Sequence, residues 1–381
     1  MRRHNYAAAV ELRHELHTHP ELSNEEVWTK QRLMDFVRQH TRRLQVHDRG
    51  NWFYAVYREP TTGTPRDTLL FRADFDALPM DEVIALPWAS KVPGKAHKCG
   101  HDGHSATLAA FAMEVDQCGA ANDVVFLWQP AEEVGMGAQQ CLPVLDAERV
   151  TRVYGYHNMS GFPYRAIAVR NGIMHCASVG MILKLTGSPA HASQPETGKN
   201  PSLAIATLIQ RIPKLTENAA GLLLCTVVQV NIGNRQFGMS AYKGELLLTI
   251  RAAYESELET LKADLVRLAE SEAAAAGLTC AIEYSDAFPE TRNAAECADH
   301  VRVVAKARGL QVCEMTAPFR PSEDFGYYGK HRPACFFFIG NGGDYPPIHT
   351  SSYDFRDEVI EVGVRMFKGL AGVREVPQSS L

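Results

Sequence analysis

Two short segments that are almost wholly apolar constrain the fold of this chain more than any other feature. They read DVVFLW at 123–128 and ACFFFIG at 334–340. Apolar runs of this length are typical of strands that helices cover on both faces of a parallel sheet. Further strands are expected at 52–58, 68–73 and 152–157, and helices at 6–18, 24–40, 104–117, 294–308 and 357–371. Because strands and helices alternate, we predict an α/β fold with a mostly parallel central sheet and flanking helices.

The middle third of the chain has a different order of elements. It reads as a strand, a helix, two strands, a long amphipathic helix and a strand, at 178–187, 199–211, 223–232, 244–252, 255–277 and 278–285. This is the β-α-β-β-α-β order of ferredoxin-like α+β domains. The chain has 381 residues, whereas a single hydrophobic core stops growing at roughly 250–300. We therefore predict a catalytic domain at 1–175 and 290–381, interrupted by an inserted ferredoxin-like lid domain at 176–289.

The bulk composition argues against several classes of protein. The formal net charge is -5 and the sequence has no basic run, so no nucleic-acid partner is expected. No stretch approaches the roughly 18 apolar residues of a membrane span, so we expect no membrane partner. The N-terminal MRRHNYAAAVELRHELH lacks the apolar segment of a signal peptide. The nine cysteines are odd in number and scattered, which favours a reducing compartment over a disulfide framework. We predict a cytoplasmic protein.

The segment HKCGHDGHS at 97–105 concentrates side chains that bind metals. A single glycine separates Cys99 from His101, so both can approach one ion from a turn before the helix at 104–117. The alternative is an ordinary polar loop that caps the helix.

Carboxylates and single histidines stand near the ends of other predicted strands. They are Asp74 and Asp76 after the strand at 68–73, Glu132 and Glu133 after the strand at 123–128, His157 at the end of the strand at 152–157, and His349 in a loop before the last helix. Taken singly, each has a structural explanation, such as a solvated glutamate or a core histidine. Ligands in α/β sheets gather at the carboxyl ends of the strands, however, and these residues can meet there. We predict a metal site at that edge, in which one glutamate binds metal and its neighbour stays free as a base.

These motifs resemble those of the M20 family of metallopeptidases and amidohydrolases, in the branch of aminoacylases, hippurate hydrolases and auxin-amino-acid hydrolases. The matching segments follow the family order from residue 12 to 358: LRHELHTHPELSNEE, FRADFDALPMDE, HKCGHDGHSATL, VVFLWQPAEE, YGYHN, GSPAHASQPETGKNP, PSEDFG and IHTSSYDFRDE. CGHDGH followed by QPAEE at this distance is highly specific. The resemblance implies a catalytic domain of the zinc-peptidase type.

The resemblance also implies a role for each candidate residue of the catalytic domain. Cys99 would bridge two metal ions, His101 and His157 would complete one, Glu133 and His349 would complete the other, and Glu132 would be the general base. Asp76 would orient a ligand histidine. Asp74 and His104 would support the site or contact the substrate.

The lid carries the remaining candidates. His191, in SPAHASQP, matches a histidine that reaches the substrate, often from the partner subunit of a dimer, and would stabilise the oxyanion. Arg251 stands where relatives keep an arginine, although an ordinary arginine on a sheet face is the alternative. Many relatives carry Asn-Val-Ile-Pro near the third lid strand to hold the substrate carboxylate. This chain instead reads GNRQFGMSAYKGE at 233–245, with Asn234 nearby but out of register.

The implied reaction is hydrolysis of the linear amide bond of an N-acyl amino acid or a related small amide, through a metal-bridging water and a glutamate base. Two divalent ions per chain are expected, and the thiolate of Cys99 favours zinc, with manganese, cobalt or nickel as alternatives. A homodimer through the lid domain is expected. One alternative is a dipeptidase or carboxypeptidase on the same site. Another is a non-catalytic metal-binding protein, which an unligated glutamate beside the metal argues against.

Overall fold

The structure, a computed structural model, describes residues 1–60 and 66–374, and its contacts divide the chain into two compact units. The first unit comprises Met1–Met174, Thr291–Ala317 and Asp324–Leu381, and the second comprises His175–Glu290 and Pro318–Glu323. The last part of the predicted catalytic segment, 375–381, lies outside the described residues. The second unit therefore interrupts the first along the chain.

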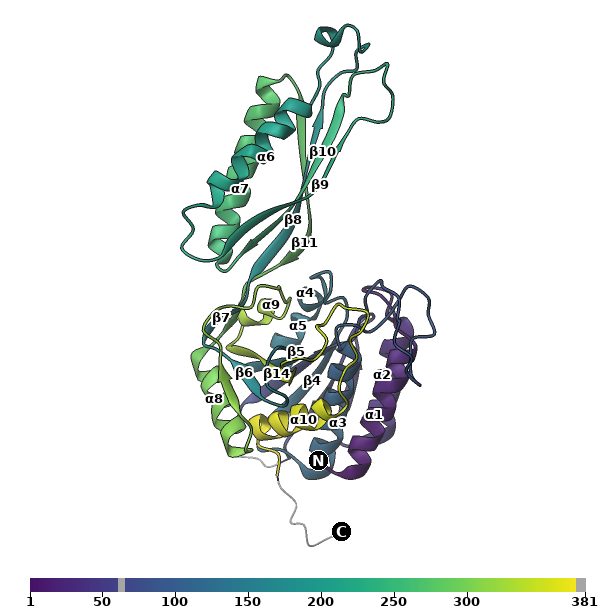
Figure 1. Ribbon diagram of the computed structural model, residues 1–381. Coiled ribbons are helices and arrows are strands. Elements are labelled where there is room, and N and C mark those ends of the chain that lie inside the picture. Colours follow the sequence, from purple (N-terminus) through teal and green to yellow (C-terminus); the bar gives the residue numbers. More distant parts are fainter. Residues whose placement is uncertain (61–65, 375–381) are drawn as a thin grey trace. The chain divides into compact units, whose positions relative to one another are not determined.

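An eight-stranded sheet organises the first unit, in the order β1-β2-β4-β3-β5-β14-β6-β13. Strands β4, β5, β6 and β14 of this sheet are labelled in Figure 1. The strands are β1 (Gln45–Asp48), β2 (Phe53–Tyr57), β3 (Thr68–Asp74), β4 (Asp123–Gln129), β5 (Arg152–Ser160), β6 (Ile167–Val169), β13 (Val312–Glu314) and β14 (Ala334–Gly342). The four central strands β4, β3, β5 and β14 are mutually parallel. Antiparallel pairs occur towards the edges, between β1 and β2, β2 and β4, and β14 and β6. The predicted mostly parallel sheet is confirmed.

The helices of the first unit are α1 (Arg3–Thr18), α2 (Val27–His40), α3 (His101–Cys118), α4 (Gly137–Cys141), α5 (Pro143–Ala147), α8 (Ala295–Ala307), α9 (Gly326–Gly329) and α10 (Glu358–Ala371). Two further strands, β7 (Gly172–His175) and β12 (Thr291–Asn293), pair with each other. Within the described residues, no helix of either unit is both long enough and apolar enough to span a membrane.

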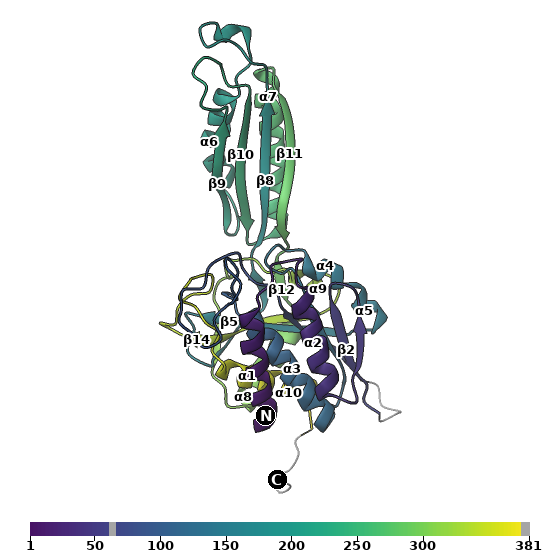
Figure 2. The same ribbon diagram turned by 90° about the vertical axis from the view of Figure 1, so that its right-hand side faces the viewer.

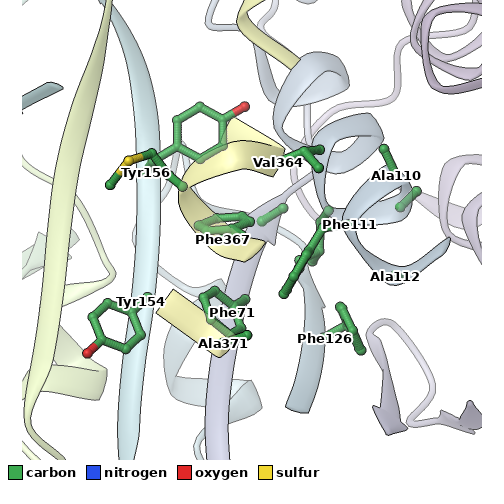
Figure 3. Close-up of a cluster of buried hydrophobic side chains, with 14 of the residues drawn as sticks. Phe71, Ala110, Phe111, Ala112, Phe126, Tyr154, Tyr156, Val364, Phe367 and Ala371 are labelled. Carbon is green, nitrogen blue, oxygen red and sulfur yellow. The ribbon is translucent and has the colours of Figure 1, made fainter. Parts of the chain in front are cut away.

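The main core of the first unit lies between one face of the sheet and helices α1, α2, α3, α8 and α10. Figure 3 shows part of it, where the ring of Phe71 lies 4.9 Å from the rings of Phe111 and Phe367. Strand residues that alternate with this set, such as Leu70 and Phe336, are also fully buried, and they point to the other face. Burial on both faces explains why these strands are apolar without alternation.

The second unit is a four-stranded antiparallel sheet in the order β11-β8-β10-β9, with two helices packed on it (Figure 2). Its elements are β8 (Ala177–Thr186), a short 3-10 helix (Pro195–Thr197), α6 (Ser202–Thr216), β9 (Leu223–Ile232), β10 (Lys243–Ala252), α7 (Glu255–Ala275) and β11 (Thr279–Phe288). Helix α7 buries Leu258, Leu261 and Leu265 at the spacing of one helical face. The predicted β-α-β-β-α-β order is confirmed.

Candidate metal centre

The candidate residues of the first unit lie at the carboxyl edge of its parallel strands. Asp74 is the last residue of β3, and Glu132 follows the end of β4. His157 lies inside β5, which continues to Ser160, so the prediction that this histidine ends its strand was wrong. His349 lies in the loop between β14 and α10. Strands that run in parallel end at one edge, which brings these segments together.

Helix α3 begins at His101, three residues earlier than predicted, so that His101 lies in its first turn with His104 rather than in a loop. Gly100 precedes the helix with φ 104°, a backbone conformation that favours glycine. A Cβ at Gly100 would lie 2.5 Å from Oδ1 of Asn158 and 2.8 Å from the hydroxyl of Tyr353. The glycine therefore allows the turn to approach β5 closely, and it brings the side chains on either side of it, Cys99 and His101, into the site.

The donor atoms converge on the Cys99 thiol. Its Sγ lies 3.2 Å from Nε2 of His157 and 3.2 Å from Nε2 of His349. Oε1 of Glu133 lies 3.5 Å from Nε2 of His349 and 3.8 Å from Nε2 of His101. One group of three donors within 4.8 Å joins His101, Glu132 and Glu133. Two others contain the thiol: Cys99, His101 and His157, and Cys99, Glu133 and His349. Both groups share Cys99.

Hydrogen bonds to Nδ1 of His101 and His157 hold these two rings with Nε2 turned towards the cluster. Nδ1 of His101 lies 3.0 Å from the carboxylate of Asp76 and 3.0 Å from its carbonyl oxygen. Nδ1 of His157 lies 2.6 Å from the carbonyl oxygen of Asn158. A carbonyl oxygen only accepts, so Nδ1 donates in both rings and Nε2 is the nitrogen left to face the cluster. This is the arrangement that metal-binding histidines require.

The cluster also leaves buried polar atoms unsatisfied. Among the described residues, neither Nε2 of His101 nor Oε1 of Glu133 has a hydrogen-bond partner. Burying such atoms without a partner is costly, and bound cations would satisfy both. A thiolate, imidazoles and a carboxylate are also the donors that zinc and late transition metals prefer. The residues present therefore fit divalent metal ions.

The charges around the cluster favour a cation as well. Burial raises the pKa of the Cys99 thiol, and the carboxylate of Glu133 raises it further. Burial opposes a charge on His101, but the carboxylates of Asp74 and Asp76 raise its pKa to about 10. In both cases nearby carboxylates favour the protonated form, and a bound positive ion would offset their charge.

Asp74 and His104 stand beside the centre in a buried network. Asp74 accepts hydrogen bonds from Nδ1 of His104 at 2.7 Å and from Arg72 at 2.6 Å. Nε2 of His104 lies 2.7 Å from Oδ1 of Asn158. Asp74, His101 and His104 also form a group of three donors. Because Arg72 and His104 already occupy both oxygens of Asp74, the geometry favours a supporting role for this pair.

Glu132 points into the same space. It is buried, and its Oε2 lies 3.9 Å from Nε2 of His101.

The backbone is unusual on two segments of the site, since Ala131 has φ 51° and His349 has φ 60°. Residues with a Cβ avoid this left-handed region unless the surrounding structure imposes it.

Three predicted residues belong to the second unit, whereas all five predicted metal ligands belong to the first. His191 is exposed, and its Nδ1 lies 2.7 Å from the hydroxyl of Ser193. Arg251, on β10, donates to the carbonyl oxygen of Arg320 and to the hydroxyl of Ser322, both at 2.7 Å. Asn234 is exposed just after β9. Their contact with a substrate stays a prediction.

The sequence reasoning missed several residues that surround the ligands. Asn158 contacts both His104 and, through its carbonyl oxygen, His157. Its position next to His157 was the available signal. Arg72 and Tyr353 carry no local signal, because their partners at the site are recognised only after folding.

Comparison with known proteins agrees with this geometry. Residues 70–372 match the model of peptidase family M20/M25/M40. The chain is 26% identical over 357 residues to the N-acetyldiaminopimelate deacetylase of Exiguobacterium sibiricum, covering 92% of this chain and 95% of the relative. It is 29% identical over 348 residues to the N-acetyl-L-cysteine deacetylase of Bacillus subtilis, covering 90% and 82%. A crystal structure from methicillin-resistant Staphylococcus aureus, provisionally described as an aminohydrolase, superposes with a TM-score of 0.85 at 28% identity, covering 96% of both chains. The chain belongs to peptidase family M20/M25/M40.

Proposed function

We propose that the protein is a metal-dependent amidohydrolase that cleaves the amide bond of N-acyl amino acids, releasing a carboxylic acid and an amine. The observation that carries this proposal is the single buried thiol of Cys99, 3.2 Å from both His157 and His349 and shared by two groups of donors. Relatives that match nearly the whole chain are deacetylases of N-acetyl amino acids, which supports the substrate class.

Two divalent ions would be held at this cluster. Cys99 would bridge them, with His101 and His157 on one ion and Glu133 and His349 on the other. The thiolate and imidazole donors favour zinc, and manganese, cobalt or nickel are the alternatives. Asp76 would keep the ring of His101 turned towards its ion, since its carboxylate accepts from Nδ1. Bound ions would polarise the substrate carbonyl and lower the pKa of a water molecule beside them.

Glu132 is the residue placed to move the proton. The neighbouring Glu133 faces two histidines, while Glu132 lies on the same buried segment at 3.9 Å from His101. Its carboxylate would accept a proton from the attacking water as the new C–O bond forms. It would then return that proton to the amide nitrogen as the C–N bond breaks. The balance is one water consumed for one acid and one amine released.

The remaining candidate residues would orient the substrate and the site. His191 would donate from Nε2 to the oxyanion, because its Nδ1 faces Ser193. Arg251 and Asn234 would contact the substrate carboxylate. Asp74 and His104 would support Asn158, which accepts from the ligand His157 through its carbonyl oxygen.

The segment at 176–289 would act as a lid and as the contact surface of a homodimer. Strand β9 lies at the edge of the four-stranded sheet and exposes Val228 and Val230. An edge strand offers unpaired N–H and C=O groups, and a second copy of the same strand can pair with it about a two-fold axis. We place the protein in the cytoplasm, with no nucleic-acid or membrane partner, from its net charge of -5 and its scattered cysteines.

The test is hydrolysis of a panel of N-acetyl amino acids and dipeptides by protein treated with a chelator and then resupplied with zinc or manganese. We expect about two bound ions per chain, loss of activity on chelation and its return with metal. Glu132→Gln should keep the metal and lose about 1,000-fold in turnover, since a general base contributes about 10²–10⁴. Full activity without metal would contradict the mechanism, and faster cleavage of dipeptides would make the protein a peptidase instead.

A further inference from the structure

Glu26 is a buried carboxyl group close to the centre that none of the roles above uses. It directly precedes helix α2, its side chain is 5% exposed, and its Oε1 accepts a hydrogen bond from the N–H of Ala131 at 2.8 Å. Ala131 stands immediately before Glu132. A residue 105 positions earlier in the chain thus holds the peptide next to the proposed base.

Capping of helix α2 does not explain the buried carboxyl group. Acidic side chains at the start of a helix usually bind its first N–H groups, but among the described residues Glu26 makes no such bond. The N–H groups of Trp28 and Thr29 are instead bonded to Glu21, at 3.2 and 2.8 Å. Because Glu21 serves the first N–H groups of the helix, the carboxyl group of Glu26 is left to its own backbone N–H and to that of Ala131, which is the contact with a distant segment.

Ala131 adopts a conformation that alanine rarely takes. Its φ of 51° lies in the left-handed region, where Cβ crowds the following carbonyl group. Its N–H is held by Glu26, and its carbonyl oxygen accepts from the N–H groups of Met136 and Gly137, both at 3.2 Å. Such a conformation persists only where the surroundings impose it. The bonds on both sides of Ala131 are the surroundings that do so.

The backbone at Ala131 determines where the next two side chains point. The N–H of Glu133 is bonded to Oδ2 of Asp76 at 3.0 Å. Glu132 therefore lies between two residues whose N–H groups are each held by a buried carboxyl group, from Glu26 and from Asp76. A rotation at Ala131 would turn Glu132 away from its place beside His101.

We propose that Glu26 is a positioning residue for the hydrolysis, which holds Ala131 in its left-handed conformation and thereby sets the direction of Glu132 and Glu133. This inference rests on the proposed function, in which Glu132 is the general base. Burial, reinforced by the charge of Asp76, raises the pKa of Glu26 to about 8. The neutral carboxyl group present below that pH still accepts through its carbonyl oxygen, and the side-chain amide of glutamine can do the same.

Three variants test the inference with the full-length, metal-loaded enzyme. Glu26→Leu should lower kcat about 10- to 100-fold, since misplacement by about 1 Å can cost about 100-fold, with KM within about twofold of wild type. Glu26→Gln should stay close to wild type because it keeps the acceptor. Glu26→Leu combined with Ala131→Gly should recover most of the lost turnover, because glycine adopts a positive φ without steric cost. Metal content and the thermal unfolding midpoint are measured for each variant.

Glu25→Leu is the matched control, because Glu25 is exposed and contacts Lys95 rather than the site. Wild-type kcat in Glu26→Leu would overturn the inference. So would a Glu26→Gln variant as impaired as Glu26→Leu, a double variant that recovers nothing, or a turnover loss that follows loss of metal. Glu132→Gln, assayed in parallel, separates the two proposals. If it is inactive while Glu26→Leu is fully active, the positioning role alone fails; if Glu132→Gln is active, the proposed base fails.

Discussion

His17 is a fully buried histidine held between two carboxylates behind the metal centre. Its Nδ1 lies 2.8 Å from Asp102 and its Nε2 lies 2.9 Å from Glu82. Burial lowers the pKa of His17, but these two carboxylates outweigh it and raise the pKa to about 9. His17 is therefore a buried cation at neutral pH, and it fastens helix α1 to the first turn of α3, where His101 lies.

This cation makes folding stability depend on pH. The pKa of His17 rises from 6.5 to about 9 on folding, which corresponds to roughly 3 kcal/mol because one pKa unit is worth about 1.4 kcal/mol. A group whose pKa is higher in the folded state binds its proton more tightly there. The stabilisation is therefore fully present below about pH 6.5 and is lost as the pH rises through about 9.

Urea unfolding of wild type and His17→Gln, with metal present throughout, measures the contribution of the His17 cation to the free energy of unfolding. The difference in unfolding free energy between the two proteins should shrink by roughly 3 kcal/mol between about pH 6 and about pH 9.5. His19→Gln is the control, because His19 is exposed and contacts no carboxylate among its described partners, which are a backbone carbonyl group of its own helix and the ring of Trp28, and it should follow the wild-type curve. Parallel curves for wild type and His17→Gln would refute the assignment of a buried cation.

Three further predictions concern Cys99 in the cluster, His191 in the second unit and Gly103 in helix α3. Cys99→Ala should reduce bound metal from about two ions to well below one per chain, measured by elemental analysis, because both donor groups lose their shared member. His191→Ala should lower turnover about 100-fold with metal content unchanged, since one oxyanion donor contributes about 10²–10³. Gly103→Ala should destabilise the fold by about 1–3 kcal/mol in thermal unfolding, because the added Cβ would lie 2.4 Å from ring atoms of Phe355.

Each of these predictions has a result that would contradict it. Unchanged metal content in Cys99→Ala, with Cys118→Ala as the control outside the site, would show that the thiol of Cys99 is not a metal ligand. Loss of metal from His191→Ala would make that histidine a ligand. An unchanged unfolding midpoint in Gly103→Ala would show that the ring of Phe355 moves aside at little cost.

The strands could be predicted where a run of apolar residues indicates burial. The segment at 334–340 is apolar because both faces of the sheet are buried, and β14 forms there. The residues at which helices and strands begin and end were harder to predict from the sequence. Helix α3 starts at His101 because Gly100 turns the backbone there, and β5 continues past His157 because β14 pairs beside it as far as Ser160. Such limits are decided by contacts with distant segments.

The candidate site, too, was predictable in part. The donor types at Cys99 and His101 could be inferred from one short motif. Their neighbours could not, because Glu26 contacts Ala131 across 105 residues and Asn158 contacts His104 across 54. Glu26 also stands in a polar segment, SNEE, where an exposed carboxylate is the ordinary expectation. Its burial follows from the packing of the segment after β4, which the sequence pattern does not report.

The position of His349 along the chain bears on how the protein is made. Cys99 and His349 are 250 residues apart, and the second unit is translated between them. A nascent chain that ends within the second unit already holds Cys99, His101 and His157, but lacks both His349 and β14, the partner of β5. In the proposed two-ion site, all the donors of one ion are therefore synthesised before those of the other ion are complete. In that proposal, a product truncated within the second unit would hold the donors of one ion and lack part of the set for the second.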